Sequence, residues 1–497
     1  MNYSELLTFL APETLLVAAA LGVLLIDLTT LRGSPARERM QWGAWLAVLA
    51  CAATFGAVFL GSGQTPPGYL DGMLVIDPLT RLVKAVILVL TIFTALVSLE
   101  TCFTDHVGEY FALLLLATAG MLFLVSTENV LLLFVALELL SLCLYIITAF
   151  DKHRVQSAEA ALKYFLFGGM SAAFLLFGLS LVYGLSGEIN LPKIAAKLAG
   201  ARLDPLLLLA LLMVVTGLGF KVAAVPFHLW APDAYQGAPT ASAAFMASGS
   251  KVASFFILAK VLMLGFAGAE GSGGWRHFAP GWVPLLAVLA ALSVVLGNLA
   301  AIAQKSVRRL LAYSAIAQAG YMLIGLLADN QQGFASLLFY ATTYALTVVG
   351  AFAVVAVVQE QTGDDTLAAF AGLRQRSPLL AVCLMIFMLS LAGIPPLAGF
   401  FGKFYLFAAA LRATPPSLGL LWLVVLALAM SAVSLYYYLQ VLKQVFVAAP
   451  PPDAPAIEPQ PATRVALVLL AASVVVLGCA PSLLLGQMLA ALARAGF

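Results

Sequence analysis

Residues 129–150 read NVLLLFVALELLSLCLYIITAF, an apolar stretch with one charged side chain, Glu138, near its middle. A helix needs about 20 consecutive apolar residues to cross the hydrocarbon core of a bilayer, and this stretch supplies them. Inside a bilayer every backbone polar group needs an internal partner, which only helices and closed barrels provide. The alternating segments of about ten residues that build barrels are absent. The stretch therefore predicts a transmembrane helix that holds an acidic group at mid-membrane depth.

The same composition extends over the whole chain. Of 497 residues, 63% are hydrophobic and 10% are charged, whereas soluble domains are about 25% charged. Apolar stretches long enough to span a bilayer number about fourteen, near 12–31, 42–60, 77–99, 110–126, 129–150, 159–185, 205–225, 240–264, 282–303, 308–327, 333–358, 378–411, 417–446 and 464–492. We therefore predict an all-α polytopic membrane protein in a lipid bilayer. The formal charge of +2 gives no reason to expect nucleic acid.

Several chemistries have no signature in the sequence. The cysteines are isolated, without the spacing of iron–sulfur, haem or zinc ligands: Cys51, Cys102, Cys143, Cys383 and Cys479. Neither a glycine-rich dinucleotide fingerprint nor a GxxxxGK[ST] phosphate loop is present. We expect no metal, no cofactor and no catalytic residue within this chain.

The loops predict an orientation. The first residues, MNYSELLTFLAPETLL, lack the basic region of a secretory signal, so the first apolar stretch is expected to remain as a span. Loops after odd-numbered spans hold about twice as many Lys and Arg residues as the others, which places them in the cytoplasm and both termini outside. Residues 448–463 are proline-rich and predict an extended tether.

Two segments predict interrupted helices. Residues 217–240, GLGFKVAAVPFHLWAPDAYQGAPT, form the seventh span and the residues after it. Residues 393–403, GIPPLAGFFGK, interrupt the twelfth. Proline removes a backbone donor and clashes with the preceding turn, so broken helices are expected where protein or a watery cavity satisfies the freed backbone groups.

The spacing of the two breaks predicts an internal repeat. Five spans separate the seventh from the twelfth, which suggests two five-helix units, each with a broken fourth helix. An odd number of helices inverts the second unit relative to the first, and such inverted repeats are typical of transporters. The expected divisions are three N-terminal helices, a first unit, a second inverted unit, a proline-rich loop and a last helix: residues 1–105, 106–270, 271–448, 449–463 and 464–497.

Charged residues inside the spans are the candidate functional groups. Glu138 and Lys251 lie in mid-span, and Lys221 and Lys403 lie beside the two breaks. Each charge costs about 2.5–3.5 kcal/mol at the centre of a bilayer, so the four would together cost about 10–14 kcal/mol, comparable to the net stability of a domain. A buried ion pair would account for Glu138 and one lysine only. We therefore predict a proton relay.

Other ionisable residues are less distinctive. His228 follows Pro226 in the seventh span and titrates near neutral pH, so it is a relay candidate. Lys163 lies about one turn inside its span, where snorkelling and transport are equally consistent with the sequence. Lys84 and Lys260 lie near span ends and are expected to snorkel or pack, and Asp27 is expected to have no transport role.

Three long motifs carry a family resemblance. Residues 219–255 (GFKVAAVPFHLWAPDAYQGAPTASAAFMASGSKVASF), 304–322 (QKSVRRLLAYSAIAQAGYM) and 387–407 (FMLSLAGIPPLAGFFGKFYLF) resemble the antiporter-like subunits of bacterial NADH–quinone oxidoreductase, respiratory complex I. The resemblance extends over roughly residues 10–490. It implies fourteen core helices, two inverted five-helix repeats with broken helices seven and twelve, and a proton half-channel in each repeat.

The resemblance also assigns residues. Glu138 matches the helix-five glutamate of the family, and Lys221, Lys251 and Lys403 match its lysines of helices seven, eight and twelve. Lys163 matches a further family lysine. Lys403 favours the N-type subunits over the M-type, which have a glutamate there, and the end of the chain soon after the last span leaves no room for the lateral helix of the L-type. Gln318 stands where many relatives have a histidine.

The function implied by the resemblance is proton translocation coupled to quinone reduction by other subunits. The chain would then be part of a translocase in the plasma membrane of a bacterium, with other complex I membrane subunits as partners. Three alternatives remain open on the sequence: a subunit of a multisubunit sodium/proton antiporter, a subunit of a membrane-bound hydrogenase, and a structural membrane anchor.

Overall fold

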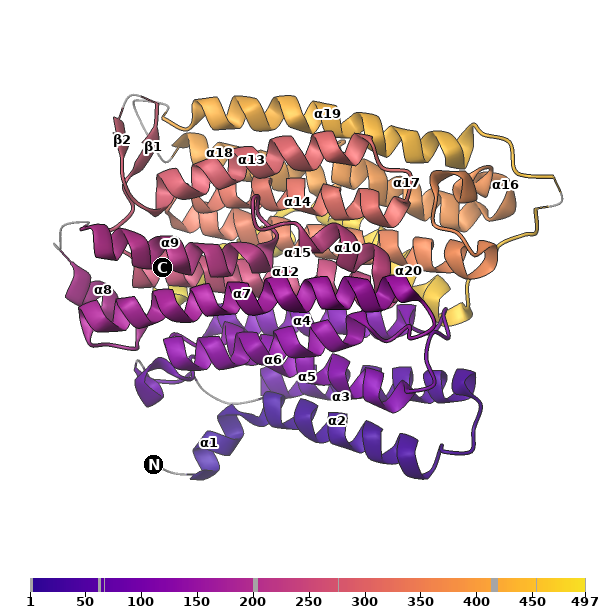
Figure 1. Ribbon diagram of the computed structural model, residues 1–497, viewed down its shortest axis with the longest axis horizontal. Helices are drawn as coiled ribbons and strands as arrows, with labels where there is room; N and C mark the ends of the chain where they lie inside the picture. The colour runs from indigo at the N-terminus through magenta and orange to yellow at the C-terminus, as the bar shows by residue number, and fades with distance from the viewer. Residues whose placement is uncertain are drawn as a thin grey trace.

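Long helices that run roughly side by side make up the protein (Figure 1). The computed structural model describes residues 3–60, 64–66, 68–199, 204–275, 277–412, 419–452 and 454–496. In these ranges the only sheet is a short antiparallel hairpin of β1 (Ser272–Gly274) and β2 (His277–Ala279), with Ser272 opposite Ala279. The predicted all-α polytopic architecture is confirmed.

In the described part of the chain, 12 helices are long and apolar enough to cross a membrane. They are α2 (Ala11–Thr29), α3 (Ala36–Leu60), α4 (Pro78–Val97), α5 (Val107–Val125), α6 (Val130–Thr148), α7 (Val155–Ser186), α9 (Pro205–Val222), the segment Thr240–Gly265, α13 (Trp282–Ile302), α15 (Gln331–Thr362), α19 (Leu421–Phe446) and α20 (Pro461–Cys479). The expected number of fourteen spans stays a prediction, because the tenth and twelfth expected spans are not among these helices.

The remaining helices complete or connect the spans. The tenth and twelfth expected spans correspond to α14 (Val307–Leu326) and to the pair α17 (Pro378–Ala392) and α18 (Ala398–Arg412). The shorter elements are α1 (Tyr3–Phe9), α8 (Leu191–Leu198), α10 (Trp230–Gly237), α16 (Leu373–Arg376), α21 (Ser482–Ala495) and the 3-10 turns η1 (Tyr69–Gly72) and η3 (Leu367–Phe370).

Polar side chains fix where many of the helices begin. Asn129 precedes α6, and its side-chain oxygen accepts hydrogen bonds from the backbone N–H groups of Leu131 and Leu132. Such a cap satisfies donors that the first helical turn leaves free. The same kind of cap starts α4, α8, α9, α14 and α15, at Asp77, Asn190, Asp204, Ser306 and Asn330. Helix starts are therefore encoded locally, even inside an apolar sequence.

The predicted break in the seventh span is present between α9 and α10. Helix α9 ends at Val222, the following Ala223 has a left-handed backbone conformation, and residues 224–229 lead to α10. Protein groups satisfy the freed backbone: Trp230 Nε1 donates to the Phe220 carbonyl at 2.9 Å, and the Val225 N–H donates to Ser293 Oγ at 2.9 Å. This is the internal satisfaction that a bilayer requires.

The predicted break in the twelfth span is present between α17 and α18. Gly393, with φ 88°, ends α17, and α18 begins five residues later at Ala398. The carbonyls of Leu391 and Ala392, left free at the end of α17, accept hydrogen bonds from the Lys403 side chain of α18. At the second break, a lysine that follows the break in sequence therefore satisfies the free carbonyls of the preceding helix.

Two expected spans are divided in ways that the sequence analysis did not predict. The eighth consists of α11 (Thr240–Ala247), α12 (Gly249–Lys260) and a π-helical turn, η2 (Val261–Gly265), with Ser248 between the two α-helices. The last, expected as one helix over 464–492, is α20 followed by α21, with Pro481 between them. Proline has no N–H to continue a helical ladder, which accounts for the second division.

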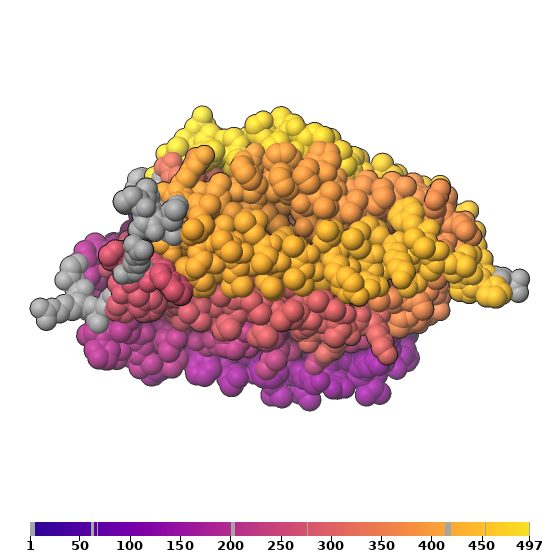
Figure 2. Space-filling model, turned by 90° about the horizontal axis from the view of Figure 1, so that it is seen from above, coloured from indigo at the N-terminus to yellow at the C-terminus, as the bar shows by residue number. Residues whose placement is uncertain are grey.

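The chain crosses the molecule from one side to the other and then returns. Helices α2 and α3 lie at one side and α19 at the other (Figure 1). The last helices, α20 and α21, come back to pack against α4 and α15. Figure 2 shows this C-terminal part (yellow) along the edge opposite to the first half (purple).

The proline-rich connector before α20 is docked and is not a free tether. Its Ile457 N–H donates to the Arg376 carbonyl at 3.1 Å, and the Gln460 N–H donates to Glu100 Oε1 at 2.7 Å. Ile457 is 1% exposed. The connector thus joins α16 to the residues that follow α4.

Candidate functional site

Glu138 begins a polar stripe on one face of α6. Ser141 and Tyr145 follow it at three and seven residues, the spacing that places side chains on the same side of a helix. Glu138 is half-buried, and its Oε1 is a buried atom with no hydrogen-bond partner among the described residues. The stripe crosses the middle of a helix whose other residues are mostly apolar.

Lys221 reaches this stripe from the end of α9, next to the first break. Its Nζ donates to Ser141 Oγ at 2.5 Å and to Tyr145 Oη at 3.3 Å. In the described part of the chain, Lys221 forms no ion pair with the Glu138 carboxylate at the start of the stripe. Helical spacing from Glu138 was the signal that could have found Ser141 and Tyr145, neither of which the sequence analysis singled out.

Gly168 of α7 gives the Tyr145 hydroxyl its space. A Cβ on Gly168 would lie 1.9 Å from Tyr145 Oη, whereas a Cβ on the adjacent Gly169 would meet nothing within 4 Å. The ring has little room to move, because the Tyr164 ring lies against it with centroids 4.6 Å apart. The close packing of α7 against α6, and the contact between Tyr145 and Lys221, therefore depend on the absence of a side chain at Gly168.

We expect Gly168→Ala to displace Tyr145 from Lys221 and to lower stability by about 1–3 kcal/mol, the usual effect of overpacking. The measurements are the midpoint of thermal aggregation in mild detergent and the position of the Tyr145 ring in the folded protein. Gly169→Ala is the matched control and should change neither. Equal behaviour of the two variants would show that the Tyr145 position is unimportant.

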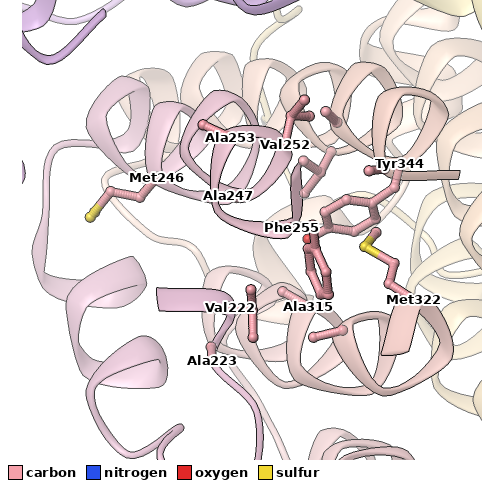
Figure 3. Packing of buried hydrophobic residues seen from close by; sticks show 14 of the residues in the cluster. Val222, Ala223, Met246, Ala247, Val252, Ala253, Phe255, Ala315, Met322 and Tyr344 are labelled. Carbon is pink, nitrogen blue, oxygen red and sulfur yellow. The ribbon is translucent and has the colours of Figure 1, made fainter. Parts of the chain in front are cut away.

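Lys251 lies in the interior of the helix bundle and reaches from α12 to α14. It is 2% exposed, and its Nζ donates to the Ala315 carbonyl at 2.6 Å. The Tyr344 ring of α15 lies beside it, with Nζ 5.6 Å from the ring centroid. Figure 3 shows the apolar side chains of this region, with the rings of Phe255 and Tyr344 close together. An ammonium group is thus enclosed by hydrocarbon and aromatic faces.

Lys403 spans the second break. It is 4% exposed, and its Nζ donates to the carbonyls of Leu391 at 3.0 Å and Ala392 at 3.2 Å and to Ser431 Oγ at 3.0 Å. The end of a helix carries unsatisfied carbonyls and a partial negative charge. The C-terminal end of α17 therefore attracts the Lys403 ammonium without a carboxylate.

Gln318 connects to Lys403 through a shared acceptor. Its Nε2 donates to the Leu391 carbonyl at 3.1 Å, the same oxygen that Lys403 uses. Gln318 also accepts a hydrogen bond from Tyr340 and donates to Tyr438 Oη at 3.2 Å. It lies on α14, three residues after the Ala315 that binds Lys251. The centroid of the Tyr321 ring of the same helix lies 4.9 Å from Lys403 Nζ, so α14 carries contacts to both lysines.

Lys163 and His228 lie apart from this interior set. Both line a cleft of about 600 Å³ between α7, α10 and α14. Lys163, with its side chain 42% exposed, pairs with Glu159 at 2.7 Å and Asp233 at 2.9 Å. Asp233 also pairs with Arg309 at 2.8 Å. Asp233 and Arg309 were missed by the sequence analysis, because their partners come from other helices.

Of the two expectations for Lys84 and Lys260, snorkelling or packing, the structure shows packing. Lys84 is 2% exposed and pairs at 2.5 Å with Glu13, which is 0% exposed. Lys260 is 1% exposed and pairs at 3.1 Å with Glu128. Both lysines lie near span ends, yet neighbouring helices cover them and each has its own carboxylate. Asp27 is likewise paired, with Arg39.

The described part of the chain contains no group of three or more His, Cys, Asp and Glu side chains arranged to hold a metal ion.

Interrupted helices with buried ionisable side chains beside each interruption define a class: polytopic membrane proteins that move ions through their interior.

Within that class, comparison with known proteins identifies the family. Residues 127–431 match the family described as NADH:quinone oxidoreductase/Mrp antiporter, TM. NADH-quinone oxidoreductase subunit N 2 of Acidobacterium capsulatum is 54% identical, over 98% of this chain and 99% of that protein. This chain belongs to the NADH:quinone oxidoreductase/Mrp antiporter transmembrane family.

Solved structures agree with this assignment. A chain of respiratory complex I from Thermus thermophilus superimposes with a TM-score of 0.76 at 36% identity, covering 96% of this chain and 98% of that one. A chain of the Mrp complex from Dietzia sp. superimposes with a TM-score of 0.82 at 22% identity, covering 99% and 98%, and shows a shared fold only.

Proposed function

We propose that this chain is the proton-translocating N-type membrane subunit of an NADH–quinone oxidoreductase. NADH oxidation and quinone reduction take place in other subunits, and this chain carries protons through Glu138, Lys221, Lys251 and Lys403. The relatives named as subunit N and the complex I structure support the assignment to that complex. The chain is then part of a translocase and needs no redox group of its own.

One contrast among the lysines supports the proton-carrying role. Five lysines are buried within the described part of the chain: Lys84, Lys221, Lys251, Lys260 and Lys403. Lys84 and Lys260, near the span ends, are ion-paired. The other three lie beside the breaks or in the interior of the bundle, and their Nζ atoms contact only hydroxyl, carbonyl and aromatic groups.

The two kinds of lysine suit different roles. Burying a charged ammonium group without a carboxylate costs free energy, and the group avoids this cost by losing its proton and becoming neutral. Paired lysines gain nothing by releasing a proton, because that would leave a buried carboxylate alone. Lys221, Lys251 and Lys403 are therefore suited to take up and release protons, whereas a purely structural anchor would be expected to pair all five.

Two matching units support a half-channel in each. Helices α7 and α15, third in their units, are both 32 residues long and both end at a glycine with positive φ, Gly187 and Gly363. In each unit an isolated antiparallel bridge joins the cap of the second helix to the segment after the third: Asn129 with Asn190, and Ser306 with Thr366. We propose that α5–α12 and α13–α19 are these units.

The second unit is inverted relative to the first in this proposal. Helix α8, which follows the first bridge, lies at the end of the bundle opposite to α16, which follows the second (Figure 1). The end with α16 faces the cytoplasm, as the distribution of loop charges favours, and both termini lie outside. Protons enter near Lys221, Lys251 and His228 and leave by way of Lys403. Lys163, held by Glu159 and Asp233 at the surface cleft, contributes at the entrance.

Membranes from a strain that lacks the chain, restored with the wild-type gene or with an empty vector, test the function. Restoration should return NADH-driven proton uptake into inverted vesicles, coupled to quinone reduction and unchanged when sodium is removed. Sodium-dependent proton exchange without NADH would instead identify an antiporter subunit. Restored proton uptake driven by hydrogen oxidation would identify a hydrogenase subunit.

A further inference from the structure

A cluster of hydroxyl and amide groups lies next to the carbonyls that bind Lys251 and Lys403. Tyr438 of α19 is at its centre: its hydroxyl lies 2.5 Å from Ser314 Oγ and accepts a hydrogen bond from Gln318 Nε2 at 3.2 Å. The Tyr340 hydroxyl donates to Gln318 Oε1. The cluster therefore joins α14, α15 and α19 by polar contacts in the membrane interior.

Every member of the cluster is enclosed by protein. Tyr438 and Gln318 are 0% exposed, and Ser314 and Tyr340 are 1% exposed. Helix α18 packs directly on one of the rings: a Cβ on Gly402 would lie 2.1 Å from Tyr340 Cδ2. Hydroxyl and amide groups without partners are costly in such an environment, so the cluster has a defined geometry.

The cluster has a lysine at each end. On one side Ser314 is the neighbour in α14 of Ala315, whose carbonyl binds Lys251. On the other side Gln318 shares the Leu391 carbonyl with Lys403. Helix α14 thus carries, within two turns, the carbonyl that binds Lys251, the Ser314 contact to Tyr438, and the glutamine that shares an acceptor with Lys403.

The groups differ in what they can do with a proton. A hydroxyl both donates and accepts, so it passes a proton on while receiving another, whereas a carboxamide neither gains nor loses one near neutral pH. Among the cluster members, Tyr438 is the hydroxyl in contact with both Ser314 and Gln318. Gln318, held by three partners, fixes the direction in which the Tyr438 oxygen presents its lone pairs.

We propose that Tyr438 transfers protons between Lys251 and Lys403, and that Gln318 and Tyr340 position it. This inference rests on the proposed function of the chain. A proton leaves Lys251 Nζ as an N–H bond breaks, and an O–H bond forms at Tyr438 by way of Ser314. The original Tyr438 O–H bond breaks in the same relay, and an N–H bond forms at Lys403. Each hop is direct or crosses one water molecule, and no electrons are transferred.

A second tyrosine–serine pair supplies a matched control. Tyr110 of α5 is 0% exposed, and its hydroxyl lies 3.1 Å from Ser98 Oγ, far in sequence from any of the unpaired lysines. Tyr438→Phe and Tyr110→Phe each remove one buried hydroxyl from a serine. Any loss due only to packing or to an unpaired serine should therefore be alike in the two variants, although Tyr438→Phe also removes one acceptor from Gln318, which keeps its bond to the Leu391 carbonyl.

The experiment compares proton pumping by the intact complex in vesicles, normalised to assembled complex, for wild type, Tyr438→Phe, Tyr110→Phe and Lys221→Ala. We expect Tyr438→Phe to lower pumping at least fivefold with the complex still assembled, and Tyr110→Phe to pump as wild type. If the Tyr438→Phe complex does not assemble, Ser314→Ala is the alternative variant. It removes the hydroxyl that contacts Tyr438 on the Lys251 side and is also expected to lower pumping.

The outcomes separate this inference from the function on which it rests. If Lys221→Ala stops pumping while Tyr438→Phe and Ser314→Ala behave like Tyr110→Phe, the Tyr438 relay is refuted and the proposed function stands. If Lys221→Ala also pumps as wild type, the proposed function itself is refuted.

Discussion

Replacing Lys221 with alanine is expected to leave the complex assembled and to remove most of its NADH-driven proton pumping. Lys221 is the basic group that contacts the Ser141 and Tyr145 hydroxyls of α6. Without it, the polar stripe that begins at Glu138 ends in a gap with no group able to accept a proton. Raising the barrier for transfer by only about 1.4 kcal/mol slows it about tenfold, so we expect a loss of at least that size.

The measurement is the initial rate of proton uptake by inverted vesicles, with the amount of complex determined on native gels. Lys152→Ala, at an exposed position in the loop after α6, is the control for loss of a positive charge. Lys221→Arg separates the two explanations for a buried lysine, because arginine keeps the charge but does not release its proton. Full pumping by Lys221→Arg would contradict a proton-carrying role and favour a structural one.

Replacing Lys84 with methionine is expected to destabilise the protein strongly. Lys84 pairs with Glu13 at 2.5 Å inside the N-terminal helices, where both side chains are almost completely buried. The Oε2 atom of Glu13 already has no hydrogen-bond partner among the described residues. Removing one partner of a buried pair costs about 3–5 kcal/mol, because the other charge is left uncompensated.

The double variant Glu13→Gln/Lys84→Met is expected to regain most of the lost stability, since neither charge remains. Thermal unfolding in detergent is measured for wild type, Lys84→Met, Glu13→Gln and the double variant, and this four-cornered cycle isolates the coupling between the two side chains. Lys152→Met is the surface control. Equal stability of Lys84→Met and Lys152→Met would mean that the pair contributes nothing.

The breaks and the lysines beside them were predictable because local chemistry determines both. Pro226 and the Gly393–Lys403 segment break a helix whatever surrounds them. A lysine in an apolar run, such as Lys251, has to lie in the interior, since lipid would exclude it. Single residues were therefore enough to predict the two broken helices and to identify Lys221, Lys251 and Lys403 as candidate functional groups.

Partners contributed by distant segments were not predictable from one sequence. Lys84 and Lys260 have the same sequence context as snorkelling lysines, and only the packing of α2 and of the loop before α6 supplies Glu13 and Glu128. Lys163 meets Asp233 because the first break turns α10 toward α7. The Tyr438 cluster draws on three helices, and its members look like ordinary core residues in sequence.

Lys403 makes the charge and the shape of the twelfth span depend on each other. Its ammonium ties α18 to the last carbonyls of α17, and a neutral amine holds carbonyl oxygens less strongly than a charged one. If Lys403 carries protons as proposed, loss of its proton weakens the contact between α17 and α18, and return of the proton strengthens it. Under the proposed function, proton transfer at Lys403 would in this way change the contact between α17 and α18.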